Sequence, residues 1–488
     1  MADHAHRTKT RLLIVGAGEA GQALAEQMRQ ESELGLEPVG FVDDDPALLG
    51  TEVAGLPVVD GTNALIEAAD RLAAQEILIA IPSARGSLIR RLVLQCKEAG
   101  LPFRIVPGLR AIIDGDVRFN QVRAVDVEDL LGRETVRFQA EAARAAVTGR
   151  SVMVTGAGGS IGGELCRQLV ALEPSELLLL GRGENSIFEI AGELEALAPN
   201  TSLVPLIADV RDTQRLRILA ERHRPRLILH AAAHKHVPLM EDHPEEAVIV
   251  NAGGTANLIE FARQVEADRF VLISTDKAAE PSSVMGATKK LAELLVRHAQ
   301  NGGGGTRFMT VRFGNVLGSR GSVVPFFLKR IAAGKPLPVT HPEMTRYFMT
   351  IREAAMLVIE AMVHGEGGAT YILDMGEPVP ILELARNLLV LSGHDPDDGG
   401  PGVEIVGVRP GEKLHESLLD PEEQLEPSGI ELIHKARCRA GDHGAVAAAM
   451  PALLAEAHGG DRHALRHRLA TLLSRPELSA EAAERGRS

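Results

Sequence analysis

The most reactive side chains that the sequence brings together are a carboxylic acid and an amine, Asp276 and Lys277. They follow the apolar run Phe270–Ile273, which predicts a buried parallel strand. Polar residues at the end of such a strand lie over the ligand crevice of an open α/β sheet, where an acid and a base could reach one substrate. A charged surface turn is the alternative, and the pair alone does not decide between the two.

A helix expected from about Ser283 carries the next candidates. Met285 and Lys289 are four residues apart, so both lie on one face of that helix. Because the helix follows the acid and the base closely, this face could complete the same site. The predicted catalytic residues are Thr275, Asp276, Lys277, Met285 and Lys289.

The composition limits the class of protein. A chain of 488 residues is long enough for about three units, each with its own core. A formal charge of -14 argues against nucleic acid as a partner. The three cysteines, Cys96, Cys166 and Cys438, lack the spacing of a disulfide framework or a metal site. No signal peptide or transmembrane segment is recognisable, so we expect a cytoplasmic protein, and peripheral association with a membrane stays open.

Residues 1–110 are predicted to form an N-terminal Rossmann-like domain. An apolar strand leads into Gly16, Gly18 and Gly21, the spacing of a dinucleotide fingerprint, and Asp43 follows a second strand. A lone fingerprint of this kind also occurs in domains whose ligand is different or lost. The ligand of this domain therefore stays open.

A second glycine loop follows the strand expected at 151–155. Gly156, Gly159 and Gly162 are spaced by two residues, and Ser160 could donate a hydrogen bond to a phosphate. Further apolar strands alternate with helix-length segments, which predicts a parallel, doubly wound sheet. The strands are expected at 177–180, 203–207, 227–229, 270–273 and 308–311.

Three boundaries follow from this pattern. Residues 111–150 are predicted as a linker with a helix near Asp126–Arg133. Residues 151–425 would form the second domain, and 426–488 an alanine-rich helical tail. The predicted fold class is α/β, with two Rossmann-like, doubly wound parallel-sheet domains.

The second domain resembles the extended short-chain dehydrogenase/reductase family. Its loop Thr155-Gly156-x-x-Gly159-x-x-Gly162 has the family pattern, and Asp209-Val210 resembles the pair that contacts adenine. The resemblance implies a bound nicotinamide cofactor and a small C-terminal substrate-binding part. It implies these cofactor-binding residues: Gly156, Gly159, Ser160, Ile161, Gly162, Arg182, Asn185, Ser186, Asp209, Val210, Ala231, Ala232 and Lys289.

One position departs from that family. An acidic residue usually accepts a hydrogen bond from the adenosine ribose at the end of the second strand, but the sequence has Gly181-Arg182-Gly183 there. Arg182 could instead contact a 2′-phosphate. We therefore expect NAD as the cofactor, with NADP as the alternative.

Besides residues 274–277 and 285–289, the second domain carries four further motifs, at 230–241, 251–257, 312–325 and 409–413. Together these motifs resemble those of the CapD-like bacterial nucleotide-sugar 4,6-dehydratases of polysaccharide and glycan biosynthesis. Many members carry membrane helices ahead of the first domain, and none is recognisable here.

The resemblance implies a reaction in which NAD(P)+ takes a hydride from C4 of a UDP-hexose, commonly UDP-N-acetylglucosamine. A base then removes the C5 proton, an acid protonates the leaving C6 hydroxyl, and the hydride returns to C6. The family assignment makes Asp276 the acid and Lys277 the base. We expect burial and nearby positive charge to lower the pKa of Lys277, because the base must be neutral. An ion pair between the two residues would defeat both roles.

The C4 step lacks its usual tyrosine. Short-chain dehydrogenases place tyrosine four residues before the active-site lysine, and that position is Met285 here. A thioether cannot accept the proton of the C4 hydroxyl. Thr275, Lys289 or a water relay must contribute, and the sequence does not decide among them.

The resemblance also implies where the UDP-sugar binds. The planar guanidinium of Arg409 suits the diphosphate. No metal is expected, because no carboxylate or cysteine completes a ligand set around His230, His234 and His236. A homo-oligomer is expected by analogy with the superfamily. The implied substrate-binding residues are Lys235, His236, Asn315, Arg320, Arg409 and Glu412.

Two other functions stay open. A UDP-sugar 4-epimerase or 4-keto reductase needs chemistry at C4 but neither a base for C5 nor an acid for C6, so the pair Asp276-Lys277 argues against it. The protein could also be a non-catalytic nucleotide-sugar-binding partner of a glycan assembly complex, although every position predicted as catalytic is filled.

Overall fold

The structure is a computed structural model in which residues 9–82, 84, 86–106, 140–394, 400–438 and 443–479 are described. The chain divides into two compact units. The first unit contains Met1–Thr135, Phe327–Leu337 and Glu383–Val403. The second contains Val136–Phe326, Pro338–Leu382 and Glu404–Ser488.

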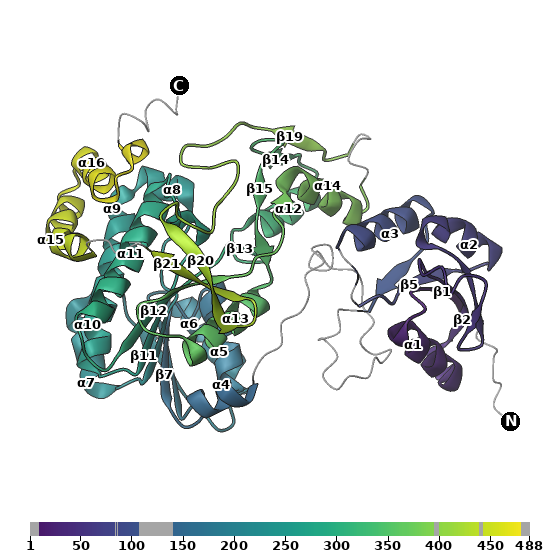
Figure 1. The fold of residues 1–488 in the computed structure, drawn as a ribbon, viewed down its shortest axis with the longest axis horizontal. Helices are drawn as coiled ribbons and strands as arrows, with labels where there is room; N and C mark the ends of the chain where they lie inside the picture. The colour runs from purple at the N-terminus through teal and green to yellow at the C-terminus, as the bar shows by residue number, and fades with distance from the viewer. Residues whose placement is uncertain are drawn as a thin grey trace. The chain divides into compact units, whose positions relative to one another are not determined.

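The first unit is built on a six-stranded sheet in the order β3-β4-β2-β1-β5-β6 (Figure 1). Every pairing is parallel except that of β3 with β4, which confirms the predicted Rossmann-like fold. At the first glycine loop, Asp43 Oδ2 accepts a hydrogen bond from the Ala17 backbone N–H at 2.7 Å. The strands are β1 (Thr10–Val15), β2 (Leu36–Val42), β3 (Glu52–Val53), β4 (Leu56–Asp60), β5 (Glu76–Ile79) and β6 (Phe103–Ile105), and the helices are α1 (Glu19–Gln30), α2 (Leu65–Arg71) and α3 (Gly86–Glu98).

The second unit is built on a nine-stranded sheet in the order β20-β21-β17-β12-β11-β10-β7-β8-β9. Strands β17 to β9 pair in parallel, and β21 and β20 are antiparallel at one edge. Side chains alternate between its faces, with Val152 and Val154 in one hydrophobic core and Met153 in another. Burial on both faces explains why the parallel strands are continuous apolar runs. Their bounds are β7 (Ser151–Thr155), β8 (Glu176–Gly181), β9 (Ser202–Ile207), β10 (Leu227–His230), β11 (Arg269–Ile273), β12 (Arg307–Arg312), β17 (Thr370–Leu373), β20 (Glu423–Ile430) and β21 (Ile433–Cys438).

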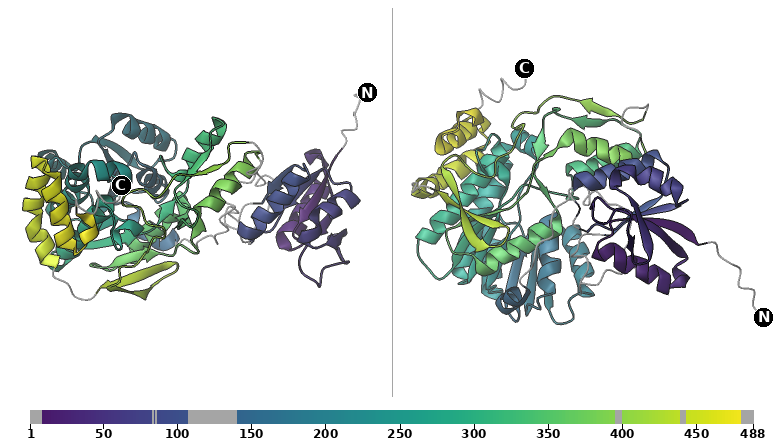
Figure 2. Two further views of the ribbon diagram at one scale, coloured as in Figure 1. Left: turned by 90° about the horizontal axis from the view of Figure 1, so that it is seen from above. Right: turned by 45° about the vertical axis from the view of Figure 1, so that its right-hand side comes forward.

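Helices cover both faces of this sheet, as a doubly wound fold requires (Figure 1). α4 (Ala140–Val147), α5 (Ser160–Val170), α6 (Glu184–Glu195) and α13 (Ile351–His364) contribute to one core. α7 (Thr213–Arg222), α8 (Val237–Asp242), α10 (Gly254–Gln264), α11 (Val284–Asn301), α15 (His443–Gly459) and α16 (Arg462–Leu473) contribute to the other. Figure 2 shows α15 and α16 packed beside α11. No helix in the described part of the chain is long and apolar enough to cross a membrane.

Shorter elements complete the chain. Strand β13 pairs with β16, and β15 pairs with β18. The remaining elements are α9 (Pro244–Ala247), a π-helical segment (Val248–Gly253), β13 (Asn315–Val316), α12 (Val323–Ala332), β14 (Leu337–Val339), β15 (Thr345–Arg346), β16 (Phe348–Met349), β18 (Val379–Pro380), α14 (Ile381–Leu391), β19 (Val403–Ile405) and short 3-10 turns at Ser32–Leu34, Thr62–Ala64, Asp276–Ala278 and Pro476–Leu478.

The segment 426–488, predicted as a helical tail, begins with strands. Most of β20 and all of β21 lie in it and extend the sheet before α15 begins. Most residues of β20 are exposed or half-buried, so its sequence lacks the apolar pattern that predicts a strand. Of the predicted linker 111–150, residues 140–150 are described and contain α4, while the helix predicted at Asp126–Arg133 lies outside the described residues.

A buried arginine joins the strands of the second unit to α11. Arg312, at the end of β12, is fully buried. Its Nε donates to Glu293 Oε1 of α11 at 3.0 Å, and its Nη1 donates to Glu423 Oε2 of β20 at 2.6 Å. Glu293 also accepts a hydrogen bond from Ser274 Oγ at 2.6 Å, directly after β11. The arginine therefore fixes β20, α11 and the end of β11 together.

We predict that Arg312→Leu lowers the free energy of unfolding of this unit by about 3–5 kcal/mol, because two buried carboxylates lose their nearest cation and the hydrogen bonds that it donates. Arg437→Leu is the matched control, since Arg437 forms an exposed ion pair with Glu426 that should contribute about 0–1 kcal/mol. Urea unfolding followed by circular dichroism measures both. Equal losses in the two variants would contradict the role of Arg312.

Candidate active site

A glycine loop joins the carboxyl end of β7 to α5. Gly156 has φ +68°, where an L side chain is strained, and a Cβ on Gly162 would lie 2.1 Å from the Gly156 carbonyl oxygen. This close approach places the first turn of α5, which begins at Ser160, against the loop. The first N–H groups of a helix have no partner within it and favour anions. The loop therefore fits the pyrophosphate of a dinucleotide.

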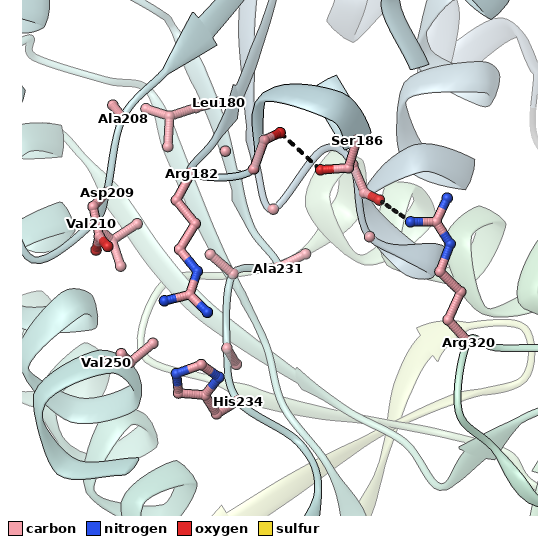
Figure 3. A pocket seen from close by; sticks show the side chains of 17 residues that line it. Leu180, Arg182, Ser186, Ala208, Asp209, Val210, Ala231, His234, Val250 and Arg320 are labelled. Carbon is pink, nitrogen blue, oxygen red and sulfur yellow. Dashed lines mark hydrogen bonds between the residues drawn. The ribbon is translucent and has the colours of Figure 1, made fainter. Parts of the chain in front are cut away.

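A cavity of about 340 Å³ opens beside this loop (Figure 3). Arg182 follows β8, and its side chain reaches towards His234 in this view. Burial and the charge of Arg182 both lower the pKa of His234. The predicted cofactor residues that line this cavity are Gly156, Gly159, Arg182, Ser186, Asp209, Val210, Ala231 and Ala232.

A second cavity, of about 560 Å³, has six lining residues in common with the first: Gly156, Gly159, Ala231, Ala233, His234 and Arg320. The glycine loop lines one part of it, and the end of β11 with α11 lines another. One ligand could therefore extend from the glycine loop to Thr275. The predicted residues that line this second cavity are Gly156, Gly159, Ser160, Ile161, Gly162, Ala231, Lys235, His236, Thr275, Lys277, Met285, Lys289, Asn315 and Arg320.

Asp276 is fully buried and lines neither cavity, so it reaches them only through its neighbours. Its Oδ1 accepts hydrogen bonds from Thr275 Oγ1 at 2.8 Å and from Lys277 Nζ at 3.1 Å. Its Oδ2 is buried and has no hydrogen-bond partner among the described residues. Buried oxygens without a partner are rare, and a catalytic role is one explanation for such an atom.

Lys277 forms an ion pair with Asp276, so in this state of the site neither residue has the protonation form that an acid or a base requires. Its Nζ also lies 3.3 Å from Glu416 Oε1. Burial lowers the pKa of Lys277, but the carboxylates of Asp276 and Glu416 outweigh that effect, so the pKa is raised. The prediction of a lowered pKa for Lys277 is therefore wrong for this state of the site, because the sequence did not reveal the second carboxylate.

Lys289 is the lysine with a lowered pKa. It is buried on α11, and its Nζ donates to the Ile273 carbonyl oxygen at 2.7 Å. Burial lowers its pKa to about 8, although Glu293 opposes the shift. Met285 is buried one turn before it on the same helix and lines the same cavity. Lys289 can therefore lose its proton near neutral pH.

The buried ring of His230 is held by hydroxyl groups. Thr155 Oγ1 lies 2.8 Å from Nδ1, and Thr255 Oγ1 lies 3.1 Å from Nε2 and donates to the Asn251 carbonyl oxygen. Burial lowers the pKa of His230 to about 3, so the ring is neutral. Among the described residues, no group of three His, Cys, Asp or Glu side chains is placed to hold a metal ion.

Four predicted residues lie outside the cavity walls. Besides Asp276, Asn185 is exposed on α6, Arg409 is exposed in the segment before β20, and Glu412 is half-buried in that segment. Arg320 lies in both cavities and its backbone N–H donates to Ser160 Oγ at 3.0 Å, so it contacts the glycine loop as well as the predicted substrate space.

The sequence analysis missed several residues of the site. Val250 lines the first cavity and Phe348 the second. Glu416 contacts Lys277, and Arg346 Nε lies 3.9 Å from the same Glu416 oxygen. No motif or spacing relates Glu416 and Arg346 to Lys277, because the fold brings them together from distant segments.

Comparison with known proteins identifies the family. The sequence profile of a family described as "Polysaccharide biosynthesis protein" matches residues 152–437. The chain belongs to this family. A second profile, described as "CoA-binding domain", matches residues 1–107, which contain the first Rossmann-like domain.

Curated relatives agree with this family. The chain is 44% identical over 434 residues to a probable polysaccharide biosynthesis protein, EpsC, from Bacillus subtilis, which is 89% of this chain and 72% of that protein. It is 42% identical over 431 residues to the capsular polysaccharide biosynthesis protein CapD from Staphylococcus aureus. The match covers 88% of this chain and 72% of that protein. A UDP-N-acetylglucosamine 4,6-dehydratase (inverting) from Campylobacter jejuni is 34% identical over 279 residues, 56% of this chain and 79% of that protein. These matches confirm the resemblance to CapD-like proteins.

Solved structures agree with the fold. The structure of Pen from Bacillus thuringiensis matches with a TM-score of 0.54 at 30% identity and covers 60% of this chain and 88% of that chain. The dTDP-glucose 4,6-dehydratase DesIV from Streptomyces venezuelae matches with a TM-score of 0.50 at 22% identity. The match covers 62% of this chain and 95% of that chain, and it supports the fold alone.

We predict that Gly162→Ala abolishes binding of NAD, because its Cβ would displace the glycine loop from α5. Gly192→Ala is the control, since a Cβ there meets nothing within 4 Å on α6. Isothermal titration calorimetry of the purified variants with NAD measures the loss. Unchanged NAD affinity in Gly162→Ala would contradict a cofactor site at this loop.

Proposed function

We propose that the protein catalyses the 4,6-dehydration of a UDP-hexose for bacterial polysaccharide or glycan synthesis, with UDP-N-acetylglucosamine as the expected substrate. The observation that carries the proposal is the contact of Lys277 Nζ with Asp276 Oδ1 at 3.1 Å beside the larger cavity. A dehydratase needs an acid and a base beyond the C4 step, and an epimerase needs neither. Relatives named UDP-N-acetylglucosamine 4,6-dehydratase, at 34% identity, support the choice of sugar.

We expect NAD as the cofactor of the smaller cavity. Gly156 and Gly162 leave room for the pyrophosphate at the start of α5. When bound, the nicotinamide would take a hydride from C4 of the sugar and return it to C6. NADP is the alternative, because Arg182 could bind its 2′-phosphate where an acidic residue would bind the NAD ribose.

The ion pair of Lys277 with Asp276 can supply both reactive forms by one proton transfer. A proton that moves from Lys277 Nζ to Asp276 Oδ1 along their 3.1 Å hydrogen bond leaves a neutral amine and a protonated carboxyl group. The amine can then take the C5 proton of the 4-keto sugar, while the carboxyl group holds the proton that the C6 hydroxyl needs to leave as water. The charged amine afterwards returns a proton to C5.

Thr275 connects the buried acid to the cavity. Asp276 does not line the cavity, whereas Thr275 does, and their oxygens are 2.8 Å apart. A protonated Asp276 could donate to Thr275 Oγ1 while the Thr275 hydroxyl donates its own proton to the C6 hydroxyl. Thr275 then relays the proton, and Asp276 acts through it.

Lys289 is the group available for the proton of the C4 hydroxyl. It lines the cavity, and its lowered pKa of about 8 makes the neutral amine accessible near neutral pH. Well below its pKa of about 8, almost all of the Lys289 amine is charged, and the charged amine cannot accept a proton. Thr275 is engaged with Asp276, and Met285 has no basic atom of sufficient strength.

Incubation of the purified protein with UDP-N-acetylglucosamine and NAD tests the function. Mass spectrometry should detect a UDP-sugar that has lost one water, and Lys277→Ala should form none while still binding NAD. A C4 epimer without water loss would favour an epimerase. The absence of turnover with every UDP-hexose tried, with cofactor bound, would leave the non-catalytic binding partner as the better account.

We predict that Thr275→Val slows water loss at least about a hundredfold, because the relay hydroxyl is gone. Reduction of bound NAD by the sugar, followed by nicotinamide absorbance, should persist. Thr275→Ser is the matched control, since it keeps the hydroxyl and should keep most of the activity. Normal water loss in Thr275→Val would exclude the relay, and a loss of NAD reduction would assign Thr275 to the C4 step.

A further inference from the structure

Glu416 lies next to the predicted base, on the segment between β19 and β20. Its side chain is only 4% exposed, so the carboxylate is removed from bulk water. Its Oε1 lies 3.3 Å from Lys277 Nζ and 3.9 Å from Arg346 Nε of β15. One carboxylate oxygen is therefore shared between two cations.

The ammonium group of Lys277 has three N–H donors and three oxygen neighbours. Asp276 Oδ1 accepts at 3.1 Å and Asn315 Oδ1 of β13 at 3.4 Å, and Glu416 Oε1 lies 3.3 Å away. The three oxygens come from three different segments of the second unit. Lys277 is therefore held at one place on the cavity wall by contacts in three directions.

Arg346 fixes the position of Glu416. Its Nη1 donates to the Thr345 carbonyl oxygen at 2.7 Å and to the Leu414 carbonyl oxygen at 3.1 Å, two residues before Glu416. The guanidinium thus holds the backbone of this segment as well as lying beside the carboxylate. Because Arg346 cannot lose its proton, Glu416 keeps a permanent counterion.

Resting on the proposed dehydration, we propose that Glu416 is a positioning residue that holds Lys277 protonated and directed at Asp276 until the substrate binds. The amine then gives its proton to Asp276, the neighbouring carboxylate that is not already shared with an arginine. No bond to carbon is made or broken by Glu416 itself. Its effect is on the position and the charge of the base.

The charges around Lys277 define the direction of the effect. Burial lowers the pKa of Lys277, the carboxylates of Asp276 and Glu416 raise it, and Arg346 lowers it. Two further cations, Lys235 and Lys289, line the same cavity. Loss of the Glu416 charge should therefore favour the neutral amine, which then forms at lower pH.

Trace acetylation of the full-length protein by acetic anhydride at a series of pH values, with the extent at Lys277 read by mass spectrometry, tests the inference. In Glu416→Gln the rise of Lys277 reactivity should move to lower pH by about one unit. Glu416→Asp, which keeps the charge, should move it less. Glu422→Gln is the matched control, because Glu422 is an exposed glutamate of the same segment. An unchanged profile in folded Glu416→Gln would overturn the role of Glu416.

The pH profile of kcat for water loss gives the second measurement. Its alkaline limb, where Lys277 loses to solvent the proton that it must pass to Asp276, should move to lower pH in Glu416→Gln and stay in place in Glu422→Gln. An unmoved limb, with active enzyme, would overturn the inference. If the wild-type protein dehydrates no UDP-hexose, the proposed function fails on its own, and the acetylation profile still decides whether Glu416 controls Lys277.

Discussion

The hydrogen bond of 3.1 Å between Lys277 Nζ and Asp276 Oδ1 is the contact on which the rest of the site depends. It lies at the carboxyl end of β11, and the glycine loop lies at the carboxyl end of β7 in the same sheet. The carboxyl ends of parallel strands all lie on the same side of a sheet, so the two segments are near each other. The fold therefore places Lys277 and the glycine loop on the walls of two adjoining cavities, with Asp276 buried next to Lys277.

The charged side chains of the site are buried, so moving one of them away from its partners costs free energy. The Arg312 cluster fixes α11, β20 and the end of β11, so Asp276 and Lys289 stand on a rigid support. The carboxylates of Asp276 and Glu416 raise the pKa of Lys277. At Lys289 the carboxylate of Glu293 also raises the pKa, but burial lowers it by more. Two lysines of one cavity thus differ in pKa, and in the proposed reaction each suits a different step, Lys289 at C4 and Lys277 at C5.

Local patterns in the sequence were sufficient for strands β7 to β12 of the larger sheet and for both glycine loops, because strand periodicity and glycine spacing are properties of neighbouring residues. The position of Asp276 behind Thr275 was not predictable, since exposure depends on packing by the whole unit. Glu416 is 139 residues from Lys277 in the chain, and no periodicity reports such a contact. β20 was missed because its polar residues hide the strand pattern.

Water loss at this pair is tested most directly by running the reaction with UDP-N-acetylglucosamine in D2O and locating deuterium in the product by NMR. If Lys277 takes and returns the C5 proton, its exchangeable amine should leave deuterium at C5 of a 4-keto-6-deoxy product, with none at C6, which receives the hydride. A product that keeps its water and carries no deuterium at C5 would contradict the assignment of Lys277 and Asp276 as base and acid.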